Sequence, residues 1–247
     1  MSAASSHRVV GCEAPPEPTL RHAEPTPVAA KNESLHGNAP DKAEAALILI
    51  DVINDLDFPE GDQLLRHALP MAERLVELKR RAKEAGVPVI YVNDNFGRWR
   101  SDFNAQVAHC MKDGVRGRPL VERLSPEHDD YFVLTPKHSA FFSTTLDTLL
   151  DYRGVKTLIL TGVAANICVL FTANDAYMRD FSLVVPSDCV ASNTGEENRH
   201  ALDEMKKVLK ADTRPSTELD LRALAGGETE AEASKPHPQP SQPARPR

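Results

Sequence analysis

The hydrophobic residues of this chain gather in short uninterrupted runs, which are separated by stretches of mixed polarity. Ala45–Ile50 is the clearest of these runs, and it ends at Asp51. A continuous apolar run of this length is typical of a strand that is covered on both faces. Further strands are predicted over residues 87–92, 131–134, 156–161 and 182–185, with a last short one near residues 211–213.

The stretches between these runs carry apolar residues at helical spacing. The first set recurs every three or four positions and consists of Met71, Leu75, Leu78 and Ala82. Pro70 is expected in the first turn of this helix, where proline is tolerated, and Gly86 just after its end. Further helices are predicted over residues 145–153, 166–179 and 196–209. Strands that alternate with helices predict an α/β fold, with a parallel sheet and helices on both of its faces.

Proline concentrates at the two ends of the chain. Six of the 19 prolines lie in residues 1–44 and five lie in residues 222–247. Both segments contain few large apolar residues, so they cannot bury enough surface to offset the entropy lost on ordering. We therefore expect disordered tails over residues 1–44 and 222–247, and one folded domain over residues 45–221.

Composition and charge exclude several classes of protein. The net charge of -7 and the pI near 5.7 leave no excess of Lys and Arg for neutralising phosphates, so nucleic acid is not an expected partner. No apolar run is long enough to span a bilayer, and residues 1–44 contain no apolar stretch typical of a secretory signal. The four cysteines show no C-x-x-C spacing, which favours a reducing compartment. We expect a cytoplasmic protein that associates with no membrane.

The candidate chemistry lies directly after the predicted strands. In a parallel α/β sheet the ligand crevice forms outside the carboxyl ends of the strands, so the topology brings Asp51, Lys137 and Cys168 together. Taken singly, such residues are usually a turn residue, a solvated charge and a small apolar filler. Taken together, they fit nucleophilic catalysis: a helix start and a nearby cation lower the pKa of a thiol, and a carboxylate can accept its proton. Backbone N–H groups in the turn at residues 162–165 can stabilise an oxyanion.

Three blocks of sequence resemble the isochorismatase-like cysteine hydrolase family, which includes nicotinamidases and enzymes similar to N-carbamoylsarcosine amidase and ureidoacrylate amidohydrolase. The blocks are LILIDVINDLDF (residues 47–58), PKHSAFFSTTLDTLL (residues 136–150) and LTGVAANICVLFTANDAYMRDF (residues 160–181). The resemblance implies a Rossmann-like three-layer α/β/α sandwich with a mostly parallel six-stranded sheet. It also implies a small-molecule substrate and a homodimer or homotetramer.

The resemblance assigns a role to each residue of the site. Asp51 is implied as the acid and base, Lys137 as its cationic partner and Cys168 as the nucleophile. A cis peptide bond between Val163 and Ala164 is implied, with the backbone N–H groups of Ala164 and Cys168 forming the oxyanion hole. Where the family commonly has Asp, this chain has Asn166, which we expect to cap the helix instead.

The residues after the second strand form a possible wall of the substrate pocket. The stretch VNDNFGRWRSDF spans residues 92–103, and an Arg in it is suited to bidentate pairing with a carboxylate. The alternative is an ordinary hydrogen-bonded surface loop. The candidate substrate-binding residues are Asn93, Asp94, Arg98, Trp99, Arg100 and Phe142.

Nicotinamidases of this family hold a metal through an Asp-x-His pair and a further His. Residues 58–98 contain only His67, which we expect on a helix surface, so no metal and no other cofactor is predicted. Cleavage of an amide, ureido or carbamoyl C–N bond is the favoured reaction. Hydrolysis of an ester, or of a vinyl ether by the Asp alone, stays open, as does a non-catalytic protein that binds a small molecule or a partner.

Overall fold

The computed structural model describes residues 42–97 and 102–226, so the larger part of both predicted tails lies outside the described residues. Six strands form one sheet in the order β3-β2-β1-β4-β5, with β6 beside β4, and every pair of these strands is parallel. The strands are β1 (Ala45–Ile50), β2 (Val89–Asp94), β3 (Tyr131–Thr135), β4 (Thr157–Val163), β5 (Ser182–Val184) and β6 (Val190–Ala191).

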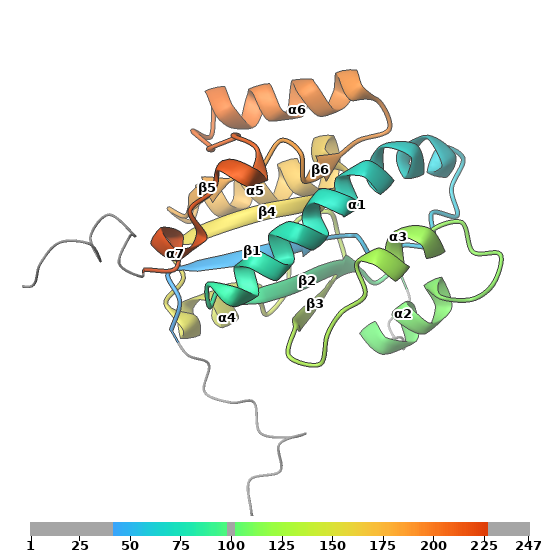
Figure 1. The fold of residues 1–247 in the computed structure, drawn as a ribbon, viewed down its shortest axis with the longest axis horizontal. Helices are drawn as coiled ribbons and strands as arrows, with labels where there is room; N and C mark the ends of the chain where they lie inside the picture. The colour runs from blue at the N-terminus through green and yellow to red at the C-terminus, as the bar shows by residue number, and fades with distance from the viewer. Residues whose placement is uncertain (1–41, 98–101, 227–247) are drawn as a thin grey trace, which may run out of the picture. The chain divides into compact units, whose positions relative to one another are not determined.

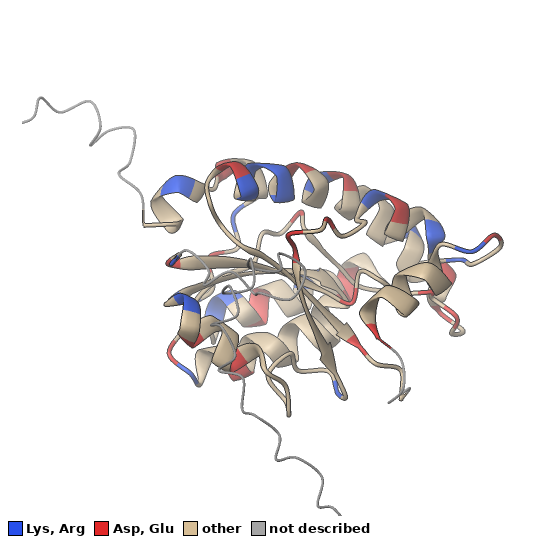
Figure 2. Ribbon diagram, turned by 90° about the horizontal axis from the view of Figure 1, so that it is seen from below, with Lys and Arg blue, Asp and Glu red and all other residues tan. Residues whose placement is uncertain are grey.

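Helices cover the sheet on both sides (Figures 1 and 2). The α-helices are α1 (Gly61–Glu84), α2 (Phe103–Cys110), α3 (Arg118–Arg123), α4 (Leu146–Arg153), α5 (Leu170–Tyr177), α6 (Gly195–Lys207) and α7 (Leu221–Leu224). A π-helical turn, η1 (Ala165–Val169), leads into α5, and a 3-10 turn, η2 (Ser216–Glu218), precedes α7.

The buried strand β1 divides the core into two layers. Its odd-numbered residues pack with α1, α2, α3 and α7, and its even-numbered residues pack with α4, α5 and α6. All six residues of β1 are buried, which is the reason for an uninterrupted apolar run. The structure therefore confirms the predicted α/β fold with a parallel sheet.

Several elements differ from the prediction. Helix α1 begins at Gly61, so Pro70 lies inside it rather than in its first turn. Pro70 faces solvent, while Ala68 and Met71 on either side of it are buried, and this packing maintains the helix although proline donates no hydrogen bond. Residues 211–213 contribute only a bridge between Val184 and Asp212.

The sequence pattern also missed several short elements. Strand β6 and helices α2 and α3 are too short for their periodicity to be evident. Helix α7 crosses the predicted domain boundary at residue 221.

A close approach between β1 and β4 positions the ends of both strands. The parallel register places Ile50 opposite Gly162, whose φ is +106°. A Cβ atom on Gly162 would lie 2.1 Å from the backbone oxygen of Ile50. Only glycine allows this contact, which brings the residue after β1 close to the turn after β4.

We predict that Gly162→Ala destabilises the fold much more than Gly154→Ala. Gly154 also has a positive φ, of +75°, but a Cβ atom there meets nothing within 4 Å. Its replacement costs about 1–2 kcal/mol, from the left-handed backbone alone. Gly162→Ala adds a clash with a backbone oxygen, which should at least double that loss.

The measurement is the free energy of unfolding of both variants from urea denaturation. Equal losses in the two variants would show that the approach of β1 to β4 tolerates a side chain.

Candidate active site

A cavity of about 360 Å³ lies at the carboxyl ends of the strands. The central strands each bring a residue to it: Asp51 follows β1, Asp94 ends β2, and His138 follows β3. Val163 ends β4, and the chain then turns through η1, which carries Cys168. The other lining residues are Asn54, Phe58, Glu60, Leu64, Phe96, Ala164, Ile167 and Asn193.

Asp51 and Cys168 are in direct contact inside this cavity. The Asp51 side chain is hydrogen-bonded to the Cys168 thiol. Its Oδ1 atom also accepts a hydrogen bond of 2.7 Å from the backbone N–H of Asp94. Asp51 is only 8% exposed and its φ is +52°, so the backbone turns sharply as β1 ends and directs the carboxyl group to the thiol.

Burial changes the proton affinity of both groups. It raises the pKa of Asp51 from 3.8 to about 6, although the hydrogen bonds from Cys168 and Asp94 oppose the rise. Burial also raises the pKa of the Cys168 thiol far above its usual range, and the Asp51 carboxylate raises it further. A backbone hydrogen bond from Ala164 acts in the opposite direction. The pair therefore holds one proton across the neutral range, because a second negative charge is strongly disfavoured.

This result corrects the expected thiol chemistry. A helix start and Lys137 were expected to lower the pKa of Cys168, but burial and the Asp51 carboxylate dominate. Lys137 is exposed, and within the described part of the chain it forms no hydrogen bond or ion pair with Asp51 or Cys168. The thiol at rest is protonated, and it needs Asp51 as a base before it can attack.

The turn that carries Cys168 has two unusual backbone features. The peptide bond between Val163 and Ala164 is cis, as the family resemblance implies. Residues Ala165–Val169 form a π-helical turn, in which the Val169 N–H donates to the Ala164 oxygen at 3.2 Å. Such π-turns are frequent at functional sites. Asn166 does not cap this turn as expected: its Oδ1 atom is buried and has no hydrogen-bond partner among the described residues.

His138 is the site residue that sequence reasoning missed. Its Nδ1 atom lies 3.7 Å from the Cys168 Sγ, and its ring packs on Phe171 with ring centroids 5.6 Å apart. The available signal was its place in the block PKHSAFF, directly after Lys137. Spacing alone cannot tell which of two adjacent side chains faces the crevice, since neither residue lies in a regular element.

Of the candidate substrate-binding residues, the structure places one in the cavity lining and two outside it, and three lie outside the described residues. Asp94 lines the cavity. Asn93 is fully buried and does not line it, because its Nδ2 atom donates to the Ile53 oxygen at 2.8 Å and supports the chain after β1. Phe142 is 53% exposed and also lies outside the lining. Arg98, Trp99 and Arg100 lie outside the described residues.

The apolar lining comes instead from Phe58, Leu64, Phe96 and Ile167. Phe58 ends the first of the three blocks that resemble the family, and Ile167 precedes Cys168. Neither position in the sequence shows that its side chain faces the cavity. In the described part of the chain no three His, Cys, Asp or Glu side chains are grouped as metal ligands, and His67 is exposed on α1. No described helix is both long and apolar enough to cross a bilayer.

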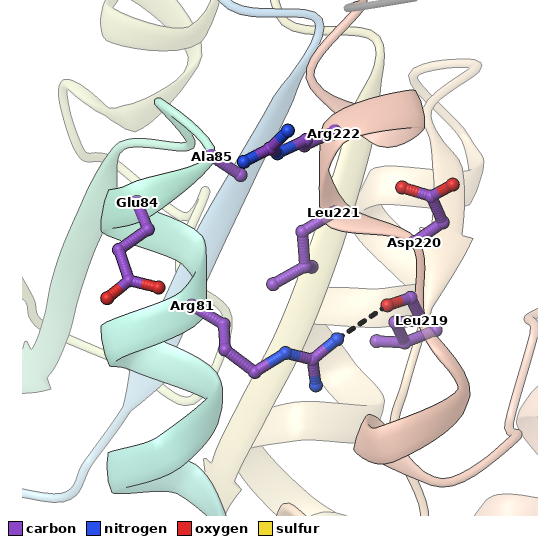
Figure 3. Close-up of a pocket in the computed structure, with 7 residues that line it drawn as sticks. All are labelled: Arg81, Glu84, Ala85, Leu219, Asp220, Leu221 and Arg222. Atoms are coloured by element: carbon purple, nitrogen blue, oxygen red, sulfur yellow. Dashed lines mark hydrogen bonds between the residues drawn. The ribbon is translucent and has the colours of Figure 1, made fainter. Parts of the chain in front are cut away.

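A second hollow, of about 390 Å³, lies between the end of α1 and residues 219–222 (Figure 3). It is near the amino ends of the strands, where the Glu44 N–H donates to the Ala225 oxygen. The Arg81 guanidinium donates hydrogen bonds to the backbone oxygens of Ser216, at 2.9 Å, and Leu219, at 2.7 Å. These two hydrogen bonds join the segment before α7 to α1.

Comparison with known proteins agrees with this geometry. The family model of the isochorismatase domain matches residues 45–213. The chain belongs to the isochorismatase-like hydrolase family. A curated member, the uncharacterized isochorismatase family protein YaaI of Bacillus subtilis, is 42% identical over 171 residues, which cover 69% of this chain and 93% of YaaI.

Two further members extend the comparison. The maleamate amidohydrolase of Pseudomonas putida is 29% identical over 195 residues, which cover 73% of this chain and 88% of that enzyme. The crystal structure of an isochorismatase family protein from Desulfovibrio vulgaris superimposes with a TM-score of 0.60 at 25% identity, covering 72% of this chain and 97% of that one. The isochorismatase-like fold is therefore shared over nearly the whole described domain.

We predict that Asp51→Asn stabilises this family member at neutral and alkaline pH. The folded protein holds the Asp51 proton more tightly than the unfolded chain, because the pKa is about 6 rather than 3.8. Wild-type stability therefore falls as pH rises from about 4 to above 6, by up to about 3 kcal/mol. Asparagine does not ionise, and its Oδ1 atom can still accept the Asp94 N–H.

The free energies of unfolding of both proteins, measured from pH 4 to pH 8, should therefore converge at pH 4 and separate at pH 8. Parallel curves would contradict a raised pKa for Asp51.

Proposed function

We propose that this chain hydrolyses an amide, ureido or carbamoyl C–N bond of a small molecule, through a thioester on Cys168. The single observation that supports this most is the hydrogen-bonded pair of Asp51 and Cys168 in a cavity at the strand ends. A relative named for amide hydrolysis, the maleamate amidohydrolase, covers most of the same domain. The pair suits acyl transfer, because it couples a nucleophile to a base that is ionised at neutral pH.

In the first half of the reaction Cys168 Sγ attacks the carbonyl carbon while Asp51 takes the thiol proton. The negative charge moves to the carbonyl oxygen, for which the backbone N–H groups of Ala164 and Cys168 are the proposed donors. Collapse of the tetrahedral intermediate breaks the C–N bond, and protonated Asp51 delivers its proton to the leaving nitrogen. The pair never carries two negative charges during these steps.

In the second half water attacks the thioester. Asp51, again a carboxylate, accepts a proton from this water, and the C–S bond breaks as the second oxyanion collapses. The sulfur leaves as a thiolate and regains the proton from Asp51, which restores the starting state. A pKa of about 6 suits Asp51 to this alternation, since a general base acts best when its pKa lies near the working pH.

We predict that Cys168→Ala loses at least 10³-fold in turnover and keeps its fold. Cys110→Ala is the matched control, because Cys110 is a buried thiol of α2 outside the cavity lining. The substrate comes from a screen of amides, ureas and carbamoyl amino acids that scores released ammonia. The wild-type kcat/KM should fall below pH 6, as Asp51 becomes protonated.

Mass spectrometry of acid-quenched reactions should find the acyl group on the peptide that contains Cys168. Near-full activity in Cys168→Ala would contradict the covalent mechanism. It would favour vinyl-ether hydrolysis in its place, for which Asp51 alone can supply the proton.

The role that the resemblance assigns to Lys137 is tested by Lys137→Met, which keeps the length of the side chain and removes its charge. If the exposed ammonium reaches the pair during turnover, kcat falls at least tenfold with the substrate found in the screen. We expect this fall, because a cation near the cavity stabilises the developing anions. An unchanged kcat would remove Lys137 from the mechanism.

A further inference from the structure

The imidazole of His138 occupies the position beside the nucleophile that the mechanism above leaves unused. Its Nδ1 atom is 3.7 Å from Cys168 Sγ, within hydrogen-bond distance for sulfur, and the residue lines the same cavity. The Asp51 carboxyl group also contacts this sulfur. Cys168 Sγ therefore has two polar side chains around it, one acidic and one imidazole.

The loop that carries His138 is joined to the helical segment that carries Cys168. The Ala140 N–H donates to Thr172 Oγ1 at 3.0 Å, and the Ser139 hydroxyl donates to the Asp175 carboxylate. The ring of His138 packs on Phe171. Phe171, Thr172 and Asp175 follow Cys168 by three, four and seven positions, so all lie on one side of η1 and α5. The distance between imidazole and thiol is therefore set by packing, although His138 itself is exposed.

The proton arrangement of the pair decides what His138 can contribute. A thiol has one hydrogen, and the Asp51 carboxylate accepts it. The Cys168 sulfur can then act toward His138 only as an acceptor, which requires the imidazole tautomer with hydrogen on Nδ1. A donor at this place stabilises sulfur whenever it carries negative charge.

We propose that His138 is a further catalytic residue, which donates a hydrogen bond from Nδ1–H to Cys168 Sγ as the thiolate forms and again as it leaves. This proposal rests on the proposed function. No proton is transferred to or from His138: the thiol proton goes to Asp51, and the imidazole keeps its own. His138 thereby offsets part of the cost of forming a thiolate in a buried site beside a carboxylate.

The test compares two variants of nearly equal size. In His138→Asn the side-chain amide nitrogen can take the place of Nδ1 as a donor, whereas His138→Leu fills similar space without one. We expect the Leu variant to lose 10- to 100-fold in kcat with KM within threefold of wild type, and the Asn variant to recover most of that loss. A merely structural role would give the two variants the same kcat.

A second measurement needs no substrate. The rate of alkylation of Cys168 by iodoacetamide at pH 7, followed on its tryptic peptide, reports how readily the thiolate forms. This rate should fall about tenfold in the Leu variant and stay within threefold of wild type in the Asn variant. Cys110 reports unfolding in the same samples, because it is buried in α2 and its alkylation should stay slow in every folded variant.

The two measurements separate the failure of this proposal from the failure of the proposed function. If no amide substrate is turned over but alkylation depends on the donor, the role of His138 at the thiol stands and the amidase function fails. The donor role is wrong if the His138→Leu and His138→Asn variants have the same kcat and the same alkylation rate. It is also wrong if the His138→Leu variant matches wild type in both measurements. Should His138→Leu not fold, His138→Ala replaces it, since the exposed position leaves the space to water.

Discussion

The candidate site is built around a carboxyl group and a thiol that share one proton in a buried place. Asp51 follows β1 and Cys168 lies in η1 after β4. Burial makes the ionisation of both groups more costly, and the Asp51 carboxylate raises the pKa of the thiol further. A thiolate at rest beside the ionised Asp51 would place a second negative charge in the same cavity. The resting state is therefore a carboxylate beside a thiol, and a thiolate forms only when the proton moves across the pair. This distinguishes the site from one in which a cation stabilises a permanent thiolate.

The scaffold around the pair serves to hold these two side chains at contact distance. Gly162 lets β4 approach the end of β1, and the Asp94 N–H fixes one oxygen of the carboxyl group. Asn93 is buried behind them and supports the Ile53 oxygen. Each contact comes from a strand neighbouring β1, so the parallel sheet is what brings the site together. A change of register between β1 and β4 would separate the carboxyl group from the thiol.

The cavity combines this polar centre with apolar walls. Phe58, Leu64 and Ile167 line the cavity together with the pair, and burial of the carboxyl group is the cause of the raised pKa of Asp51. Asp94 and Asn193 add polar side chains to the same lining. Burial therefore raises the pKa of Asp51 toward neutral pH, and the cavity joins this carboxyl group to the mainly apolar walls that are typical of small-molecule sites.

The amino-acid sequence by itself determined the α/β class, the parallel sheet and the two residues of the pair. Buried strands such as β1 are recognisable from uninterrupted apolar runs, and chemistry at their carboxyl ends follows from topology. Tertiary structure alone decided which neighbours surround the pair. His138 contacts the thiol although Lys137 precedes it, and Asn93 points into the core although Asp94 lines the cavity. Tertiary structure also reversed the expected direction of the Cys168 pKa shift, because burial and the Asp51 charge raise this pKa. Both effects depend on packing in three dimensions, which the periodicity of the sequence does not encode.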